Sequence, residues 1–294
     1  MEGMTKKQHY VPRFYLRHFS GDRGSLCAYR RPENRYFKTK PEDICNERFL
    51  YESRIGEGDN FFRTNHIEHK LSEKESDFSK YQDVLLKCCR EQDFTSKSFE
   101  EGRLSICDFV ANLISRNPYF LKKDRALATD VAEDLARSEQ LAETDWMLLN
   151  CIGLEGGLEP LADAAIMNFT LLSGDLKAPA AQIKETLAMK RMNILQASSD
   201  MPFVSCSMPI TFIDINDDCS DFDIALLPLS SRYAALFDRK QSDGELELLT
   251  TEMTVQFNAT ILASNEIWLT AFGCNEEALR AAVDLIEKYR QMQR

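Results

Sequence analysis

Residues 6–19, KKQHYVPRFYLRHF, combine side chains that transfer protons, hold anions and stack on rings. Histidine changes its protonation near neutral pH, and a basic, aromatic surface is typical of sites that hold phosphates and stack bases. The same composition is typical of an amphipathic anchor that buries its rings and keeps its charged ends in water. We therefore expect either a nucleic-acid site or a packed anchor. In the first case His9 is the candidate catalytic group, and the candidate substrate contacts are Lys7, Tyr10, Arg13 and Arg17.

Two carboxylates, Glu68 and Glu75, lie in a segment whose apolar residues repeat with the helical period from about residue 64 to residue 90. Seven residues make nearly two turns, so both carboxylates lie on one edge of the predicted helix. At that edge they can reach the basic N-terminal segment. Two roles stay open, namely ion pairing with Lys7, Arg13 or Arg17, and general-base or metal-binding work with pKa values shifted by partial burial.

A polar row crosses the second predicted helix, residues 98–115, where Ser98 and Glu101 fit a capping box. Asp108, Asn112 and Arg116 recur every four residues on a helix that is otherwise strongly apolar. The row is either a solvent-exposed edge or a buried hydrogen-bonded network. Arg116 adds a planar fork of donors that suits phosphate or carboxylate, so it joins the candidate substrate contacts.

The sequence assigns no complete metal site, although a divalent metal is compatible with the hydrolytic hypothesis. His66 and His69 are three residues apart and can share a metal, but Glu68 points away from both. His9 or His18 and a carboxylate would have to complete the ligand set. Motifs for dinucleotides, ATP, zinc proteases and nucleophilic serines are absent from the sequence.

The net charge of −11 is unevenly distributed. Residues 1–40 carry ten Lys or Arg against three acids, whereas the remainder carries 26 basic and 44 acidic side chains. The basic segment either docks on the acidic body or forms a positive patch for phosphates. The nine cysteines include no C-x-x-C pair, which indicates a reducing cytoplasm without a disulfide framework. No apolar run is long enough to span a membrane, so we expect no membrane partner.

Hydrophobic periodicity predicts an α+β fold in a single domain, residues 1–294. We expect an N-terminal β-hairpin, a central helical block, and a C-terminal mixed or antiparallel sheet with two helices. The three sub-regions are a basic β-rich part (1–62), a helical block (63–192) and an α/β part (193–294). The hairpin comprises residues 26–31 and 35–40, and a third strand lies near 48–53. Further helices are expected at 122–150, 160–172, 179–191, 251–264 and 275–292, and strands at 193–198, 202–207, 210–215, 224–229, 233–239 and 266–272.

The order of these features resembles the family called domain of unknown function 4238. QHYVPRFYLRHFS, followed by a glycine-containing loop and LCAYRR, resembles its N-terminal signature. The resemblance covers nearly the whole chain, and it implies a bacterial, cytoplasmic protein and, by analogy, an antiviral or toxin-like nuclease. The other matching positions are the acidic Glu68 and Glu75, the Arg-x-Pro of Arg116 and Pro118, and Pro209, Pro228 and Leu229 in the C-terminal strands.

The chain departs from the family at one motif. Where the family tends to have Ser-Asp-Asn-Pro, this sequence has Cys206-Ser207-Met208-Pro209. If the family's Asp is a metal ligand, this protein is inactive or uses Asp214 instead. If that Asp forms a turn, Ser207 can replace it, because both side chains can cap a backbone N–H.

Two hypotheses from different classes follow. The first is a metal-dependent, nuclease-like hydrolase in which His9, Glu68 and Glu75 carry the chemistry and Arg116 holds a phosphate. It predicts that these groups converge in one cleft. The second is a non-catalytic binding or regulatory module whose basic N-terminal segment packs on an acidic body. It predicts that His9 is buried, hydrogen-bonded and remote from any open pocket.

Overall fold

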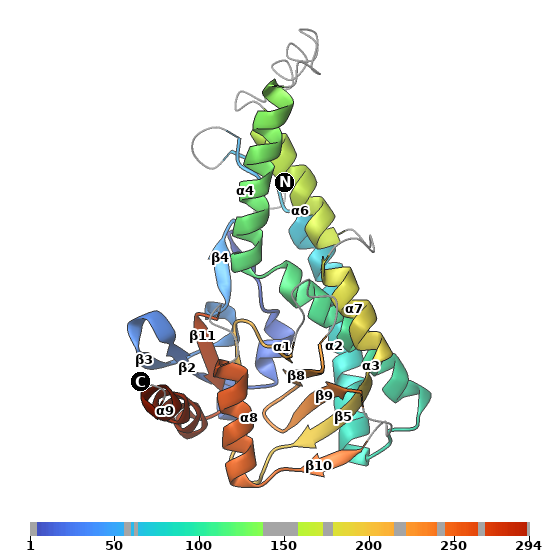
Figure 1. Cartoon of the computed structure of the whole chain (residues 1–294), viewed down its shortest axis with the longest axis vertical. Coiled ribbons are helices and arrows are strands. Elements are labelled where there is room, and N and C mark those ends of the chain that lie inside the picture. The colour runs from blue at the N-terminus through green and yellow to red at the C-terminus, as the bar shows by residue number, and fades with distance from the viewer. Residues whose placement is uncertain are drawn as a thin grey trace.

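The computed structural model describes residues 5–55, 60–61, 64–137, 158–172, 179–214, 222–239, 245–263 and 268–292. Within these ranges the chain forms the predicted α+β fold. Two sheets lie at one end of the molecule, and the helices α4 and α6 project together from the other end (Figure 1). The predicted helix residues 138–150 lie outside the described part of the chain.

A four-stranded antiparallel sheet joins the two ends of the chain. Its order is β3-β2-β11-β6, and β2 and β3 form the predicted N-terminal hairpin. Asn34 takes the left-handed conformation in the connection, with a φ of 47°, as an asparagine tolerates better than most residues. The bounds are β2 Leu26–Arg30, β3 Arg35–Thr39, β6 Ser205–Cys206 and β11 Thr270–Gly273.

The second sheet has five strands in the order β10-β5-β9-β8-β7. β10 pairs parallel with β5 and the other pairs are antiparallel, so the sheet is mixed. The sequence did not predict β10, because it has only three residues, none of them is buried, and they show no long alternation. The bounds are β5 Arg191–Gln196, β7 Thr211–Ile213, β8 Ile224–Pro228, β9 Tyr233–Asp238 and β10 Leu246–Leu248.

The N-terminal segment is packed between these sheets. Strand β1, Lys7–His9, pairs with β4, Asn46–Arg48, and the short helix α1, Arg13–Arg17, follows. The predicted third strand near residues 48–53 therefore lies earlier in the chain. Tyr15 is fully buried, and its hydroxyl donates to Pro228 O of one sheet at 2.6 Å and bonds Ser205 Oγ of the other at 2.9 Å.

The helices follow the predicted order, with two boundaries that differ. Helix α3 is capped by Ser96, whose Oγ accepts from Phe99 N at 3.2 Å, so the expected cap at Ser98 was wrong. Helix α4 begins at Pro118, earlier than predicted, because proline is well suited to a first helical turn. The bounds are α2 His66–Glu91, α3 Lys97–Ser115, α4 Pro118–Arg137, α6 Glu159–Leu172, α7 Pro179–Met189, α8 Thr251–Ala263 and α9 Glu276–Met292, and 3-10 turns lie at Asp22–Gly24, Arg31–Glu33 and Pro41–Asp43.

One hydrophobic cluster connects α1, the helical block and both sheets. On α2, Ile67, Leu71 and Leu85 are buried as the period predicts, whereas Tyr81 is 38% exposed. The cysteines in the described ranges are all free thiols. In the same ranges, no helix is both long and apolar enough to cross a membrane.

Candidate functional site

Arg116 is the centre of a buried polar cluster that joins the N-terminal segment to the helical block. It caps the C-terminal end of α3 and is 1% exposed. Its Nε donates to Tyr51 Oη at 3.0 Å, and its Nη1 donates to Glu75 Oε1 at 2.7 Å and to Asn112 Oδ1 at 3.3 Å. Its Nη2 donates to the backbone oxygen of His9. The guanidinium therefore fixes strand β1 against both α2 and α3.

The charge of Arg116 is well compensated. Burial opposes the charged form, but the Tyr51 hydroxyl and the Glu75 carboxylate outweigh it and raise the pKa of Arg116 above its ordinary value. Since most of its N–H donors already have protein partners, Arg116 acts in this structure as an organising group. The predicted row on α3 is thus partly a buried network, through Asn112 and Arg116, and partly a surface edge, through the half-exposed Asp108.

A second buried carboxylate, Glu52, supports the same segment from the loop after β4. Its Oε1 accepts from Gln8 Nε2 at 2.7 Å and from Asn65 N at 3.2 Å. Gln8 Oε1 in turn accepts from Tyr51 N at 2.8 Å. The sequence did not indicate Gln8, Tyr51 or Glu52, because isolated polar residues in a three-residue strand and a loop carry no periodic signal.

Glu68, on the first turn of α2, has a perturbed carboxyl group. Burial raises its pKa to about 7, Arg116 opposes the rise, and the nearby Glu75 and Glu52 add to it. Its Oε2 is buried and has no hydrogen-bond partner. A buried polar atom without a partner is rare and calls for an explanation, and a carboxyl group that titrates near neutral pH is suited to proton transfer.

His9 carries the complementary perturbation. Burial, and after it the cations Arg13 and Arg116, lower its pKa to about 4, although backbone hydrogen bonds with Pro41 and Glu42 oppose the shift. Because proline has no N–H, the ring donates to the Pro41 carbonyl oxygen. Nε2 is buried without a partner, so Nδ1 carries this proton and Nε2 presents a lone pair.

Arg13 lies beside both groups. It is exposed at the start of α1, and its charge lowers the pKa values of both His9 and Glu68. No ion pair of Arg13 occurs among the described residues. His9, Glu68 and Arg13 therefore combine a base, an acid and an available cation around the Arg116 cluster.

The remaining candidate residues lie elsewhere. Lys7 pairs with Asp43 at 3.1 Å and Arg17 with Glu42 at 3.5 Å, so the expected pairing of these cations with the α2 carboxylates was wrong. Glu75 pairs with Arg116 instead. Tyr10 is buried in the core, where burial raises its pKa far above the ordinary value.

The predicted metal ligands do not form a ligand set within the described ranges, where no group of three or more His, Cys, Asp or Glu side chains could hold a metal ion. Ser207 is buried, and its Oγ accepts from Leu269 N at 2.9 Å and Thr270 N at 3.4 Å. It thus has the backbone-capping role that an aspartate at this position could also fill. Asp214 is exposed after β7 with a φ of 54°.

One family is found by comparison with known sequences. The sequence model described as "Protein of unknown function (DUF4238)" matches residues 7–270, which is most of the chain and includes β1, the Arg116 cluster and the five-stranded sheet. Of the four-stranded sheet it includes every strand except β11, of which it reaches only Thr270. Searches of curated proteins and of solved structures found no match.

Proposed function

Because this chain belongs to the DUF4238 family, whose description assigns no activity, its function has to be argued from the site, and we propose that it is a hydrolase that cleaves RNA. One observation carries the proposal. His9 Nε2 and Glu68 Oε2 are both buried without a partner, and their pKa values are displaced in opposite directions beside the same two arginines. Pairs of titratable groups whose pKa values are pushed apart are typical of acid–base catalysis.

The displaced pKa values define the protonation states. Between about pH 4 and about pH 7, His9 is neutral and Glu68 still carries its proton. His9 can therefore accept a proton while Glu68 donates one. The exposed guanidinium of Arg13 supplies a positive charge for the phosphate, as arginine does at many phosphate sites.

The reaction that uses these groups is attack by the ribose 2′-oxygen on the adjacent phosphorus. His9 Nε2 takes the 2′-hydroxyl proton as the new P–O bond forms. The bond from phosphorus to the 5′-oxygen breaks, and Glu68 gives its proton to that oxygen. The products of this step are a 2′,3′-cyclic phosphate and a 5′-hydroxyl, and the requirement for a 2′-hydroxyl selects RNA over DNA. Water then attacks the cyclic phosphate: Glu68 takes a proton from the water, the bond from phosphorus to the 2′-oxygen breaks, and His9 gives its proton to that oxygen. This second step completes the hydrolysis and returns both groups to their starting protonation states.

Initial rates on single-stranded RNA test the proposal between pH 3.5 and pH 9, with EDTA and with Mg²⁺ or Mn²⁺ in parallel. We expect a bell-shaped profile with limbs near 4 and near 7. His9→Asn and Glu68→Gln should each lose about 100-fold or more in rate. The His9 substitution is selective, because the Arg116 cluster uses the backbone oxygen of His9 and not its ring.

Matched controls are His69→Asn and Glu73→Gln, both exposed on the same helix as Glu68. Full activity in His9→Asn or Glu68→Gln would refute the assigned roles. Activity that appears only with a divalent metal would favour the metal-dependent hydrolase over the metal-free scheme. No cleavage of RNA under any of these conditions would refute the hydrolase.

A binding module is the second candidate, and one observation favours it. The N-terminal segment buries Tyr10, Tyr15 and Phe19, and Tyr15 bonds both sheets, as a structural anchor would. If the protein is a binding module, it does not cleave RNA, and Glu68→Gln raises its thermal stability without weakening the binding of its partner. A cytoplasmic location is part of both proposals and is supported by the free cysteines. The toxin or phage-defence role implied by the family resemblance belongs to the first proposal, the hydrolase that cleaves RNA.

A further inference from the structure

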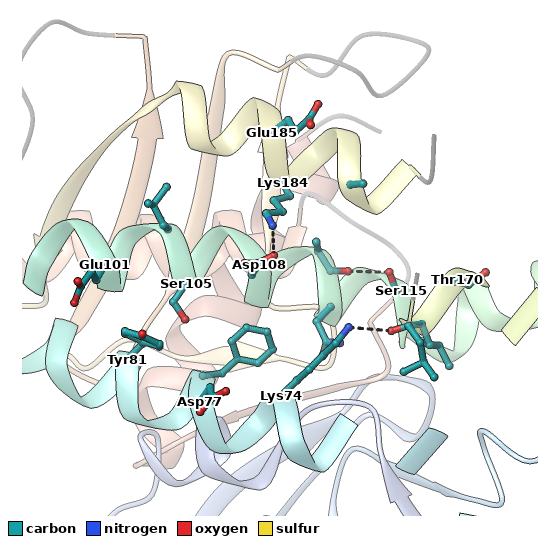
Figure 2. A pocket seen from close by; sticks show the side chains of 17 residues that line it. Lys74, Asp77, Tyr81, Glu101, Ser105, Asp108, Ser115, Thr170, Lys184 and Glu185 are labelled. Atoms are coloured by element: carbon teal, nitrogen blue, oxygen red, sulfur yellow. Dashed lines mark hydrogen bonds and ion pairs between the residues drawn. The ribbon is translucent and has the colours of Figure 1, made fainter. Parts of the chain in front are cut away.

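A pocket of about 600 Å³ lies on the helical block, between α2, α3, α6 and α7. Figure 2 shows its polar side chains, which come from all four helices. Its volume is in the range of small-molecule sites. The pocket includes neither His9 nor Glu68, the proposed proton-transfer groups, and Asn112 is its one residue from the Arg116 cluster.

One end of the pocket offers cations and amide donors. Lys74 is exposed at the pocket, where its Nζ donates to Leu171 O at 3.5 Å, and it has no carboxylate partner within the described ranges. Lys184 lies on the opposite wall, where its Nζ meets Asp108 Oδ1 at 2.6 Å. Burial lowers the pKa of Lys74, Asp108 opposes this, and Lys184 and Arg116 lower it further. A bound anion would relieve the repulsion among these cations.

Asn112 adds a donor whose orientation is fixed. Its Oδ1 must face Arg116, because Nη1 donates to it at 3.3 Å. Its Nδ2 therefore points away from Arg116, and Asn112 also lines the pocket. No acceptor for this Nδ2 occurs among the described residues, so its two N–H groups are available to an anionic oxygen.

The other end of the pocket is aromatic and apolar. Tyr81 is 38% exposed and Leu104 is 44% exposed, although both belong to helices that are otherwise packed on the core. Tyr81 follows Lys74 by seven residues, which is about 10 Å along a helix, and Figure 2 shows the two side chains at opposite ends of the pocket. This separation is comparable with the length of an extended mononucleotide from its phosphate to the far edge of its base.

The acidic lining limits the ligand to a single phosphate group. Asp77 and Glu101 line the pocket, and Figure 2 places Glu101 near Tyr81 and Asp77 between Tyr81 and Lys74. Carboxylates accept hydrogen bonds from sugar hydroxyls and base amino groups, but they repel further phosphates. We propose that this pocket binds a nucleoside monophosphate, with its phosphate at Lys74 and Asn112 and its base against Tyr81. The proposal rests on the groups in the pocket and does not depend on RNA cleavage.

Calorimetric titration of the full chain with AMP, CMP, GMP and UMP tests this site. We expect saturable one-to-one binding of at least one of them, with inorganic phosphate and the matching nucleoside at least tenfold weaker. Lys74→Met should weaken nucleotide binding by tenfold or more. Tyr81→Ala should weaken it by about tenfold, because a stacked base is lost, while leaving the weak binding of phosphate unchanged.

Lys70→Met is the matched control, since Lys70 lies one turn earlier on α2, is exposed and pairs with Glu73 at 3.0 Å. Thermal melting verifies that each variant is folded, and Lys74→Gln replaces Lys74→Met if the latter melts early. Absence of binding by all four nucleotides, or unchanged binding in the Lys74 variant, would overturn the site. Equal affinity for phosphate alone and no effect of Tyr81→Ala would overturn its assignment to nucleotides.

Discussion

Replacement of Arg116 by methionine should destabilise the protein strongly, because it removes the charge around which the N-terminal segment is organised. The substitution deletes hydrogen bonds to Tyr51, Glu75, Asn112 and the backbone of His9. It keeps the length of the side chain and much of its apolar packing. The dominant cost is therefore electrostatic, since the Glu75 carboxylate loses its ion pair.

The magnitude follows from the burial of the two partners. Removal of one partner of a buried ion pair costs about 3–5 kcal/mol. Glu75 is 25% exposed, so water can hydrate part of its charge. We therefore expect the lower end, about 3 kcal/mol, which for a chain of this length corresponds to a fall in Tm of about 5 °C. In the Arg116→Met background, Glu75→Gln should recover part of the loss because it removes the unpaired charge.

Urea unfolding followed by circular dichroism measures these differences, with the double variant completing a double-mutant cycle. Arg137→Met is the matched control, because Arg137 is 69% exposed and pairs with Glu133 on the surface of α4. Its cost should stay below about 1 kcal/mol. If Arg116→Met is no more harmful than Arg137→Met, the Arg116 cluster does not hold the N-terminal segment and our reasoning is wrong.

Three further predictions concern stability. The unfolded chain loses the Glu68 proton near pH 4.5, whereas the folded chain keeps it to about pH 7, so this group lowers stability as the pH rises across that window. Glu68→Gln should therefore raise Tm relative to wild type at pH 8 but not at pH 4.5, and equal differences at both pH values would contradict the shift. Ser96→Ala removes the cap on Phe99 N and should cost about 1 kcal/mol in urea unfolding, where no change would argue against the cap. Gly21→Ala places a Cβ 2.8 Å from Cys274 O and should lower the free energy of unfolding by about 1–3 kcal/mol. A neutral effect would show that the backbone at Gly21 and the backbone at Cys274 can move apart.

Periodicity predicted the elements well because burial imposes it. The alternation of the hairpin and the apolar stripe of α2 appear in the structure. Local capping signals were less reliable where two serines, Ser96 and Ser98, can each cap the same helix. Ser98 with Glu101 fits a capping box, but the helix starts at Ser96, and Phe99 is then buried against Phe94 with ring centroids 5.4 Å apart. The Ser96 side chain caps the helix two residues earlier than predicted, and Phe99 is packed in the first helical turn.

The site was predicted in part. The sequence placed His9, Glu68, Glu75 and Arg116 in one region, and the structure brings them around one guanidinium. It did not predict that Arg116 would take Glu75 as its partner, because the end of α3 meets the middle of α2 only through the packing of the two helices. The displaced pKa values of His9 and Glu68 depend on burial in three dimensions, which no spacing along the chain encodes.

The sheet β3-β2-β11-β6 has a consequence for how the protein is made. β2 pairs Arg30 with Thr270, so β2 is synthesised long before the strand that it pairs with. Until Gly273 has left the ribosome, the inner edge of β2 has no partner and exposes unpaired backbone groups that invite aggregation. Sheet closure of this kind is slow because the loop between its strands is long. A nascent or truncated chain that ends before β11 is therefore a natural substrate for chaperones and proteases.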